Sequence, residues 1–321
     1  MSVDFSVVIP IYCEEENLEE LHRRLAGALE KIGGTSEIIF VNDASQDRSL
    51  ELMRKLRRGD PRVRIISFSR NFGHQTALTA GMRHARGRAV ALMDGDLQDP
   101  PEALPEMLSR MRETKAEVVY AVRRKRKENW FIRALYYLFY RALQSMSYID
   151  IPTDAGDFCI MSRRAVDQLN AMPERSRFVR GLRSWVGFRQ VGFEYEREAR
   201  NAGAPKYTFK GLARLALDAF FSFSFVPLRL STLLGLGIST LGLIYAAWIV
   251  AQRVTGQFQA IAGWSTVVVS VLVLGGAQLI MLGIMGEYLG RIYEELKGRP
   301  PYVIDETIGF DEDRANPEPD A

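Results

Sequence analysis

Two long stretches toward the C-terminal end of the chain contain no charged residue. The first runs from Leu230 to Gln252 and the second from Val254 to Gly286, which is apolar from about Trp264 onward. Because a helix rises about 1.5 Å per residue, each stretch can cross a hydrocarbon core roughly 30 Å thick. The sequence therefore predicts two transmembrane helices, at about 229–252 and 263–286. Buried helices of a soluble core are the alternative, although such helices seldom lack charge over this length.

Basic residues flank the membrane segment predicted at 229–287, and the loop inside it carries only Arg253. By the positive-inside rule, the chain on both sides of this segment lies in the cytoplasm. The flanking residues are Lys206, Lys210, Arg214, Arg229, Arg291, Lys297 and Arg299. We therefore expect an inner-membrane protein with a cytoplasmic N-terminal domain at 1–205, a juxtamembrane amphipathic segment at 206–228 and a cytoplasmic tail at 288–321.

The amino-acid composition excludes few classes of function. Forty-two Lys and Arg against 39 Asp and Glu give a net charge of +3, and no nucleic-acid partner is expected. The chain from Asp305 to its end is acidic and rich in proline, which predicts disorder there. Cys13 and Cys159 stand far apart, which fits a reducing compartment without disulfides. The N-terminus has no pattern of a cleavable signal peptide.

The N-terminal part alternates short apolar runs with amphipathic stretches. Leucines from Leu18 to Leu29 recur at helical spacing, and a second helix is expected around Leu50 to Leu56 with Ser45 as its N-cap. This order predicts an α/β fold with a mostly parallel, doubly wound sheet. Its predicted strands are rich in β-branched residues and cover 5–11, 37–41, 62–68, 89–93 and 117–121.

Polar side chains follow three of these strands. Pro10, Tyr12 and Glu14 end the first, Asp43 follows the second, and the stretch DGDLQ at 94–98 follows the fourth. Because the carboxyl ends of parallel strands meet at one edge of a sheet, where ligands bind, these side chains should converge. Tyr12 could then stack on a base, and Asp43 could accept hydrogen bonds from a base or a ribose.

The stretch LMDGDLQDPP, residues 92–101, places like charges directly after an apolar run. Residues two apart in extended chain point the same way, so Asp94, Asp96 and Gln98 can offer oxygens to one divalent cation. The sequence has no glycine-rich phosphate loop, so Mg²⁺ or Mn²⁺ held by these oxygens would neutralise a nucleotide diphosphate. A DxD pattern alone is weak evidence, and an acidic turn without a ligand is the alternative.

Several motifs occur in order between about residue 3 and residue 300. They are VVIPIYCEEENL, VNDASQD, SFSRNFGHQTAL, DGDLQDPPE, DAGDF at 154–158 and RNAGAPKY, followed by the two apolar stretches. In this order they resemble the polyisoprenyl-phosphate glycosyltransferases of glycosyltransferase family 2. The resemblance implies a GT-A nucleotide-sugar domain, a divalent metal, and transfer of a hexose to polyprenyl (undecaprenyl) phosphate on the cytoplasmic leaflet. UDP-glucose is the first choice of donor, and other UDP-hexoses and GDP-mannose stay open.

The resemblance also implies roles for particular residues. Asp157 lies near the place of acceptor-side acids, although a loop-supporting role is equally open, and His74 receives no role. The nucleotide sugar would contact Pro10, Tyr12, Glu14, Asp43, Asp94, Arg200 and Lys206. The metal would be held by Asp94, Asp96 and Gln98. The residues expected to take part in catalysis are Asp94, Asp96, Arg123, Arg133 and Asp157, of which Arg123 and Arg133 match positions that face the lipid phosphate.

Two segments alternate aromatic and basic residues and are expected to lie in the headgroup zone of the membrane. They cover 130–141 and 207–225. Ordinary core helices are the alternative for both. The basic run RRKRK at 123–127 could bind anionic headgroups or be a solvated surface.

The acceptor determines the expected mechanism. A phosphate monoester has a second pKa near ~6, so its oxygen is already anionic and needs no strong general base. We expect a single displacement with inversion, in which basic groups and the metal stabilise the departing diphosphate.

Three other functions stay open on the sequence alone. A DxD phosphatase would have Thr or Val where Gln98 stands, and a processive polysaccharide synthase would carry QxxRW, to which Arg183-Ser-Trp185 is the nearest text. A non-enzymatic membrane scaffold is the third. The sequence leaves a homo-oligomer open.

Overall fold

The computed structural model describes residues 3–123, 155–175, 177–195, 226–255 and 263–310. The chain divides into two compact units. The first holds the described residues up to 195 together with 299–310, and the second holds those from 226 to 298.

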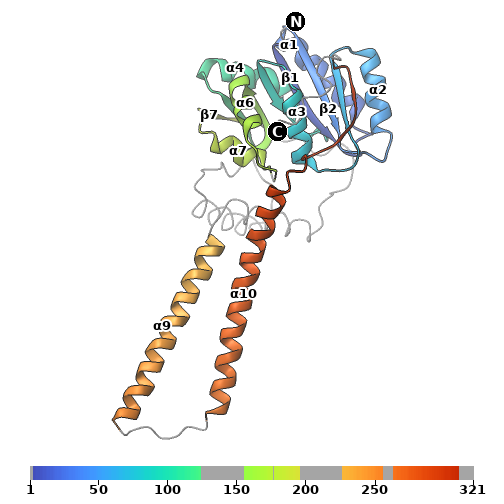
Figure 1. The fold of residues 1–321 in the computed structure, drawn as a ribbon. Helices are drawn as coiled ribbons and strands as arrows, with labels where there is room; N and C mark the ends of the chain where they lie inside the picture. Colours follow the sequence, from blue (N-terminus) through green and yellow to red (C-terminus); the bar gives the residue numbers. More distant parts are fainter. Residues whose placement is uncertain (1–2, 124–154, 176, 196–225, 256–262, 311–321) are drawn as a thin grey trace. The chain divides into compact units, whose positions relative to one another are not determined.

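The first unit is built on a sheet with the strand order β7-β5-β6-β4-β1-β2-β3-β8 (Figure 1). Its strands are β1 (Phe5–Ile11), β2 (Ser36–Asn42), β3 (Val63–Phe68), β4 (Ala89–Leu92), β5 (Val118–Arg123), β6 (Ala155–Ser162), β7 (Gln190–Tyr195) and β8 (Ile304–Ile308). The pairs β1–β2, β1–β4, β2–β3 and β5–β7 are parallel, whereas β6 is antiparallel to β4 and β5, and β8 is antiparallel to β3. The predicted α/β fold with a mostly parallel sheet is confirmed.

Helices cover both faces of this sheet. Alternate residues of β1 face opposite ways, so Val7 and Ile9 pack in one core and Val8 in the other. The first core contains α1 (Leu18–Ile32), α2 (Ser49–Gly59) and α4 (Leu104–Thr114). The second contains α3 (His74–His84), α6 (Arg163–Ala171) and α7 (Val179–Trp185).

Helix α3 lies very close to the central strands. A Cβ at Gly81 would collide with Val8 Cγ1 and lie 3.2 Å from Val41 Cγ2, so only glycine allows this approach. Because α3 begins at the carboxyl edge of the sheet, its close packing fixes where its first residues, His74 and Gln75, can reach.

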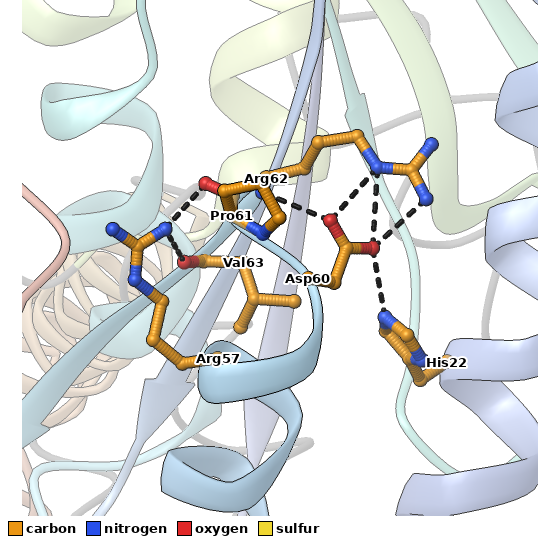
Figure 2. Close-up of polar contacts among 6 residues, drawn as sticks. All are labelled: His22, Arg57, Asp60, Pro61, Arg62 and Val63. Carbon is orange, nitrogen blue, oxygen red and sulfur yellow. Dashed lines mark hydrogen bonds and ion pairs between the residues drawn. The ribbon is translucent and has the colours of Figure 1, made fainter.

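The connection from α2 to β3 is held by a polar cluster (Figure 2). Arg62 donates from Nε and Nη2 to the Asp60 carboxylate, and His22 Nε2 of α1 lies 3.0 Å from Asp60 Oδ2. Arg57 closes the same turn by donating to the carbonyls of Pro61 and Val63. The cluster precedes β3 and therefore stabilises the amino edge of the sheet, opposite the carboxyl edge where ligands bind.

The strand β8 corrects the sequence-based prediction for the C-terminal region. Disorder was expected from Asp305 onward, but Ile304–Ile308 pairs with β3. Tyr302 stacks on Phe68 with ring centroids 5.1 Å apart, and Arg54 forms an ion pair with Glu306. Residues 299–310 thus belong to the same compact unit as the sheet. The prediction was wrong for the residues of β8, because acidic composition gives no sign of a strand that is stabilised by pairing with a distant edge. Residues 311–321 lie outside the described residues.

The second unit contains two long helices, α9 (Val226–Val254) and α10 (Trp264–Leu296). Gly235 of α9 lies against Met281 of α10. Among the described residues, one helical segment is long and apolar enough to cross a membrane, Val269–Leu296, and none of it is buried. The apolar part of α9, Ser231–Tyr245, is shorter. Two helices therefore occur where two were predicted, but only one is confirmed as a candidate span, and α10 continues beyond the predicted end at 286.

Candidate active site

Three strand ends meet at one edge of the sheet, as predicted. β1 lies between β4 and β2 and is parallel to both, so the residues after each strand share an edge. In the sheet, β2 and β3 lie on one side of β1, and β4 lies on the other side. The strand order thus reverses between β1 and β4, the position where α/β sheets bind ligands.

The chain turns sharply after β4. A Cβ at position 95 would lie 2.7 Å from Ile11 Cδ1 and 3.3 Å from Pro10 O, so Gly95 permits the close approach to β1. Asp96 Oδ1 then accepts a hydrogen bond from the Gln98 amide at 3.2 Å, and buried Leu97 adopts a positive φ of 61°. The turn places Asp94, Asp96 and Gln98 at the tip of β4.

Asp94 is half-buried and lies among other acids. Its side chain is 31% exposed, but its Oδ1 is buried and accepts no hydrogen bond from any described residue. The pKa of Asp94 is raised to about 7, chiefly by burial and further by the carboxylates of Asp99, Asp157 and Asp96, against the opposing effect of His74. A site that penalises negative charge in this way favours the binding of a cation.

Asp157 of β6 lies in a different electrostatic environment. It is 13% exposed; Gln75 Nε2 donates to its Oδ2 at 3.0 Å, and Arg180 Nε lies 3.5 Å from its Oδ1. Burial alone would raise its pKa, but the hydrogen bond with His74 and the charges of Arg180 and Arg183 hold the pKa of Asp157 well below its usual range. Asp157 therefore stays ionised and is a poor proton acceptor.

His74 joins the two acids. Its Nε2 lies 3.5 Å from Asp94 Oδ1 and 3.5 Å from Asp157 Oδ2. Burial lowers the pKa of His74, but the hydrogen bond with Asp157 and the negative charges of Asp94, Asp157 and Asp43 outweigh this effect and raise it. From the sequence alone, His74 received no role. The only signal was its place in the motif RNFGHQTAL, after a strand and at the start of a helix.

Asp43 shapes the segment that leads to His74. Its carboxylate is buried and accepts the backbone N–H groups of Phe72 at 2.6 Å and Gly73 at 2.9 Å. Burial raises the pKa of Asp43, and these two hydrogen bonds oppose the shift. The role in nucleoside binding predicted for Asp43 stays a prediction, and these hydrogen bonds show that it orders the start of α3.

The end of β1 is tied to the end of β2. Cys13, with a φ of 54°, donates its amide to Ser45 Oγ at 3.0 Å, so Ser45 does not cap a helix as predicted. Helix α2 begins later, at Ser49, whose Oγ accepts the Glu14 amide. These contacts leave Tyr12 at the surface, 39% exposed, where a ring could stack on a base.

The remaining predicted residues are only partly described. Pro10 is buried within β1, opposite Val41, where it shapes the strand end. Arg123 is the last residue of β5, but its side chain is not described. Arg133, Arg200 and Lys206 lie outside the described residues, as do both predicted interfacial segments at 130–141 and 207–225.

The residues at the tip of β4 fit a divalent cation. Within the described ranges, no group of three or more His, Cys, Asp or Glu side chains is arranged to hold a metal. Mg²⁺, however, is usually bound by one or two carboxylates together with substrate phosphates. The buried Asp94 Oδ1 without a hydrogen bond and the raised pKa of Asp94 fit such a partly formed site.

Comparisons with known proteins agree with this architecture. Residues 6–169 match the family model of Glycosyl transferase family 2. The chain is 44% identical over 313 residues to the uncharacterized glycosyltransferase YkcC of Bacillus subtilis, covering 97% of this chain and 96% of YkcC. It is 38% identical over 300 residues to the SfII prophage-derived bactoprenol glucosyl transferase of Shigella flexneri, covering 93% and 96%.

Among solved structures, the chain is similar to glucosyl-3-phosphoglycerate synthase from Mycobacterium tuberculosis, whose structure is in complex with Mn²⁺, uridine diphosphate and phosphoglyceric acid. It is 16% identical, with a TM-score of 0.46, and the match covers 68% of this chain and 78% of that one. The family match over half of the chain and the relatives over nearly all of it confirm the resemblance seen in the sequence. This chain belongs to glycosyl transferase family 2, with the GT-A-like α/β fold expected for that family.

Proposed function

We propose that this glycosyltransferase moves glucose from UDP-glucose to undecaprenyl phosphate at the cytoplasmic face of the membrane, with inversion at the anomeric carbon. The observation that carries the proposal is the half-buried Asp94, set among acids at the switch point between β1 and β4. The acceptor and the sugar are inferred from the relative named bactoprenol glucosyl transferase, which is similar over 93% of this chain.

The donor would lie across the carboxyl ends of β1, β2 and β4. Tyr12 is exposed at the tip of β1 and would stack on the uracil ring, while the DGDLQ turn would face the diphosphate. A divalent cation held by Asp94, Asp96 and Gln98 would supply positive charge to the leaving diphosphate.

The acceptor phosphate requires little proton transfer. With a second pKa near ~6, it is already largely ionised at neutral pH. Asp157, whose pKa is held below its usual range, is accordingly assigned no general-base role. Instead its negative charge holds His74 beside Asp94, and Arg180 compensates that charge. We assign the binding of the lipid phosphate to Arg123 and Arg133, and the closing of the donor site to Arg200 and Lys206.

The membrane attachment is part of the proposal. Val269–Leu296 is apolar and unburied, which supports a span. The large apolar side chains of α9, such as Leu236 at 66% and Leu243 at 72% exposure, support a second one. Two spans would anchor the chain in the membrane that holds the lipid acceptor.

One assay tests this function. Purified full-length protein in detergent is incubated with undecaprenyl phosphate and with each radiolabelled nucleotide sugar in turn, with and without EDTA, and the label in the organic phase is counted. The expected result is transfer from UDP-glucose that stops on chelation and returns with added Mn²⁺. Label in the organic phase from no donor would reject the transferase assignment, whereas transfer that survives chelation would reject the metal alone.

The same assay separates the alternatives left open by the sequence. A phosphatase would release inorganic phosphate without moving sugar, and a processive synthase would add more than one sugar to each acceptor. A scaffold would tolerate Asp96→Asn, which we expect to abolish transfer while leaving the fold intact.

A further inference from the structure

One side chain joins three separate elements next to the candidate site. Gln75, the second residue of α3, donates from Nε2 to Asp157 Oδ2 on β6 at 3.0 Å. Its Oε1 accepts the backbone N–H of Val179, the first residue of α7, at 2.8 Å. These partners are 82 and 104 residues away along the chain. Gln75 therefore links parts of the fold that no local structure brings together.

The chemistry of the amide suits this position. A carboxylate accepts hydrogen bonds and a backbone N–H donates one, so the two partners require both ends of a primary amide. Glutamate at this position could accept from Val179 but would repel Asp157. Methionine would fill similar space and make neither hydrogen bond. The two substitutions thus separate the contact with Asp157 from the contact with α7.

Holding Val179 also places the next residue. Arg180 Nε lies 3.5 Å from Asp157 Oδ1, so α7 supplies a positive charge to the carboxylate oxygen that Gln75 does not bind. His74, the residue before Gln75, lies 3.5 Å from Asp157 Oδ2 and 3.5 Å from Asp94 Oδ1. Residues from the first turn of α3 and the first turn of α7 therefore both contact the Asp157 carboxylate.

We propose that Gln75 is a positioning residue that acts through Asp157. It fixes the orientation of that carboxylate and the approach of Arg180, and through His74 this sets the position of Asp94 at the tip of β4. The inference rests on the proposed function, in which Asp94 faces the donor diphosphate. Gln75 itself contacts no substrate in this scheme.

The test compares the wild type with Gln75→Glu and Gln75→Met, each made also in an Asp157→Asn background, in the full-length protein. The probes are UDP-[14C]glucose and undecaprenyl phosphate, and kcat and KM are measured for each. As a matched control, Asn170→Ala removes another side-chain hydrogen bond to α3, the one from Asn170 Nδ2 to the Met82 carbonyl at 3.2 Å. Thermal unfolding of every variant reports any general loss of stability.

We expect both Gln75 variants to lower kcat by roughly 10–100-fold, the range for residues that orient a functional side chain, with the KM for UDP-glucose changed by about twofold or less. In the Asp157→Asn background the same substitutions should have little further effect, because residues that act through one another are not additive. Asn170→Ala should keep the wild-type kcat. Unchanged kcat in both Gln75 variants would overturn the inference. An equal loss of kcat in the wild-type and Asp157→Asn backgrounds, in proportion to a fall in melting temperature, would also overturn it.

Failure of this inference can be told apart from failure of the proposed function. A wild type that transfers no glucose would reject the function itself. A wild type that transfers glucose, with Gln75 and Asp157 acting independently, would reject only the positioning role.

Discussion

His74 Nε2 lies 3.5 Å from Asp157 Oδ2, although the two residues come from a helix and a strand that are distant in sequence. The same nitrogen lies 3.5 Å from Asp94 Oδ1. The imidazole therefore separates two carboxylates that would otherwise repel each other. One of them stands at the tip of β4, where the cation and diphosphate are expected.

Replacing His74 should impair catalysis more than stability. In His74→Ala the two acids lose the positive group between them, and we expect activity to fall roughly 10–100-fold. The side chain is 38% exposed, so the melting temperature should change little. His84→Ala is the control, since His84 lies at the other end of α3, where its Nδ1 is 2.8 Å from the Ala80 carbonyl. Equal activity in both variants would contradict a role for His74.

Gly95 offers a test of the turn geometry. Alanine there would press on Ile11 and Pro10, and we expect about 1–3 kcal/mol of destabilisation, as for other overpacked sites, with loss of activity because Asp94 and Asp96 shift. Gly27 in α1 has open space around its Cα, so Gly27→Ala should raise stability by about 0.5–1 kcal/mol. Chemical denaturation and the transfer assay measure both effects. A Gly95→Ala protein with normal activity would show that the turn tolerates a different path.

The contacts of the Asp60 carboxylate should make the free energy of unfolding depend on pH (Figure 2). Burial would raise its pKa, but the hydrogen bonds from Arg62 and His22 outweigh burial and lower it from 3.8 to about 2. A lowered pKa in the folded state stabilises the fold above the unfolded value, and this contribution disappears as the pH falls toward 2. For a side chain that is 10% exposed, the shift corresponds to about 2 kcal/mol.

The matched variant is Asp60→Asn, with unfolding followed between pH 6 and pH 2.5. The difference in free energy of unfolding between wild type and variant should be largest near pH 6 and should shrink as the solution becomes acidic. A difference that stays constant across this range would mean that the Asp60 carboxylate is not the stabilising group.

Because β8 pairs with β3, we expect the C-terminal segment to be needed for stability. Deleting residues 302–321 would expose the edge of β3 and uncover Phe68, which stacks on Tyr302. Exposed strand edges promote association, so we expect a lower melting temperature and aggregation on size-exclusion chromatography. A shorter deletion of 311–321 leaves β8 in place and is the control. Identical behaviour of the two deletions would contradict a structural role for β8.

The central strands could be predicted from the sequence because their signal is local. The runs at 5–11 and 62–68 are apolar and β-branched, and they coincide with β1 and β3 within one residue. Convergence of the DGDLQ turn with the end of β1 followed from the rules of parallel sheets and is confirmed. Strand β8 was missed because its short segment is stabilised by pairing with a strand more than 200 residues away.

The candidate site could be predicted only where a strand end carries it. Asp94 and Asp96 follow β4 directly, whereas Gln75 and Arg180 reach Asp157 through contacts between α3, β6 and α7. Hydrophobic periodicity in the sequence cannot predict such contacts, because they depend on how closely α3 approaches the sheet at Gly81. Ser45 was assigned to a helix cap for a related reason, since its bond to the Cys13 amide spans 32 residues.

The proposed function depends on sugar transfer to a lipid phosphate that requires the acids after β4. Mass spectrometry of the lipid extract, after undecaprenyl phosphate and UDP-glucose are incubated with the wild type, Asp94→Asn or Asp96→Asn, tests this most directly. We expect the wild type to add one hexose to undecaprenyl phosphate and either folded variant to give no detectable product. Unmodified lipid with the wild type, or equal product from all three proteins, would contradict it.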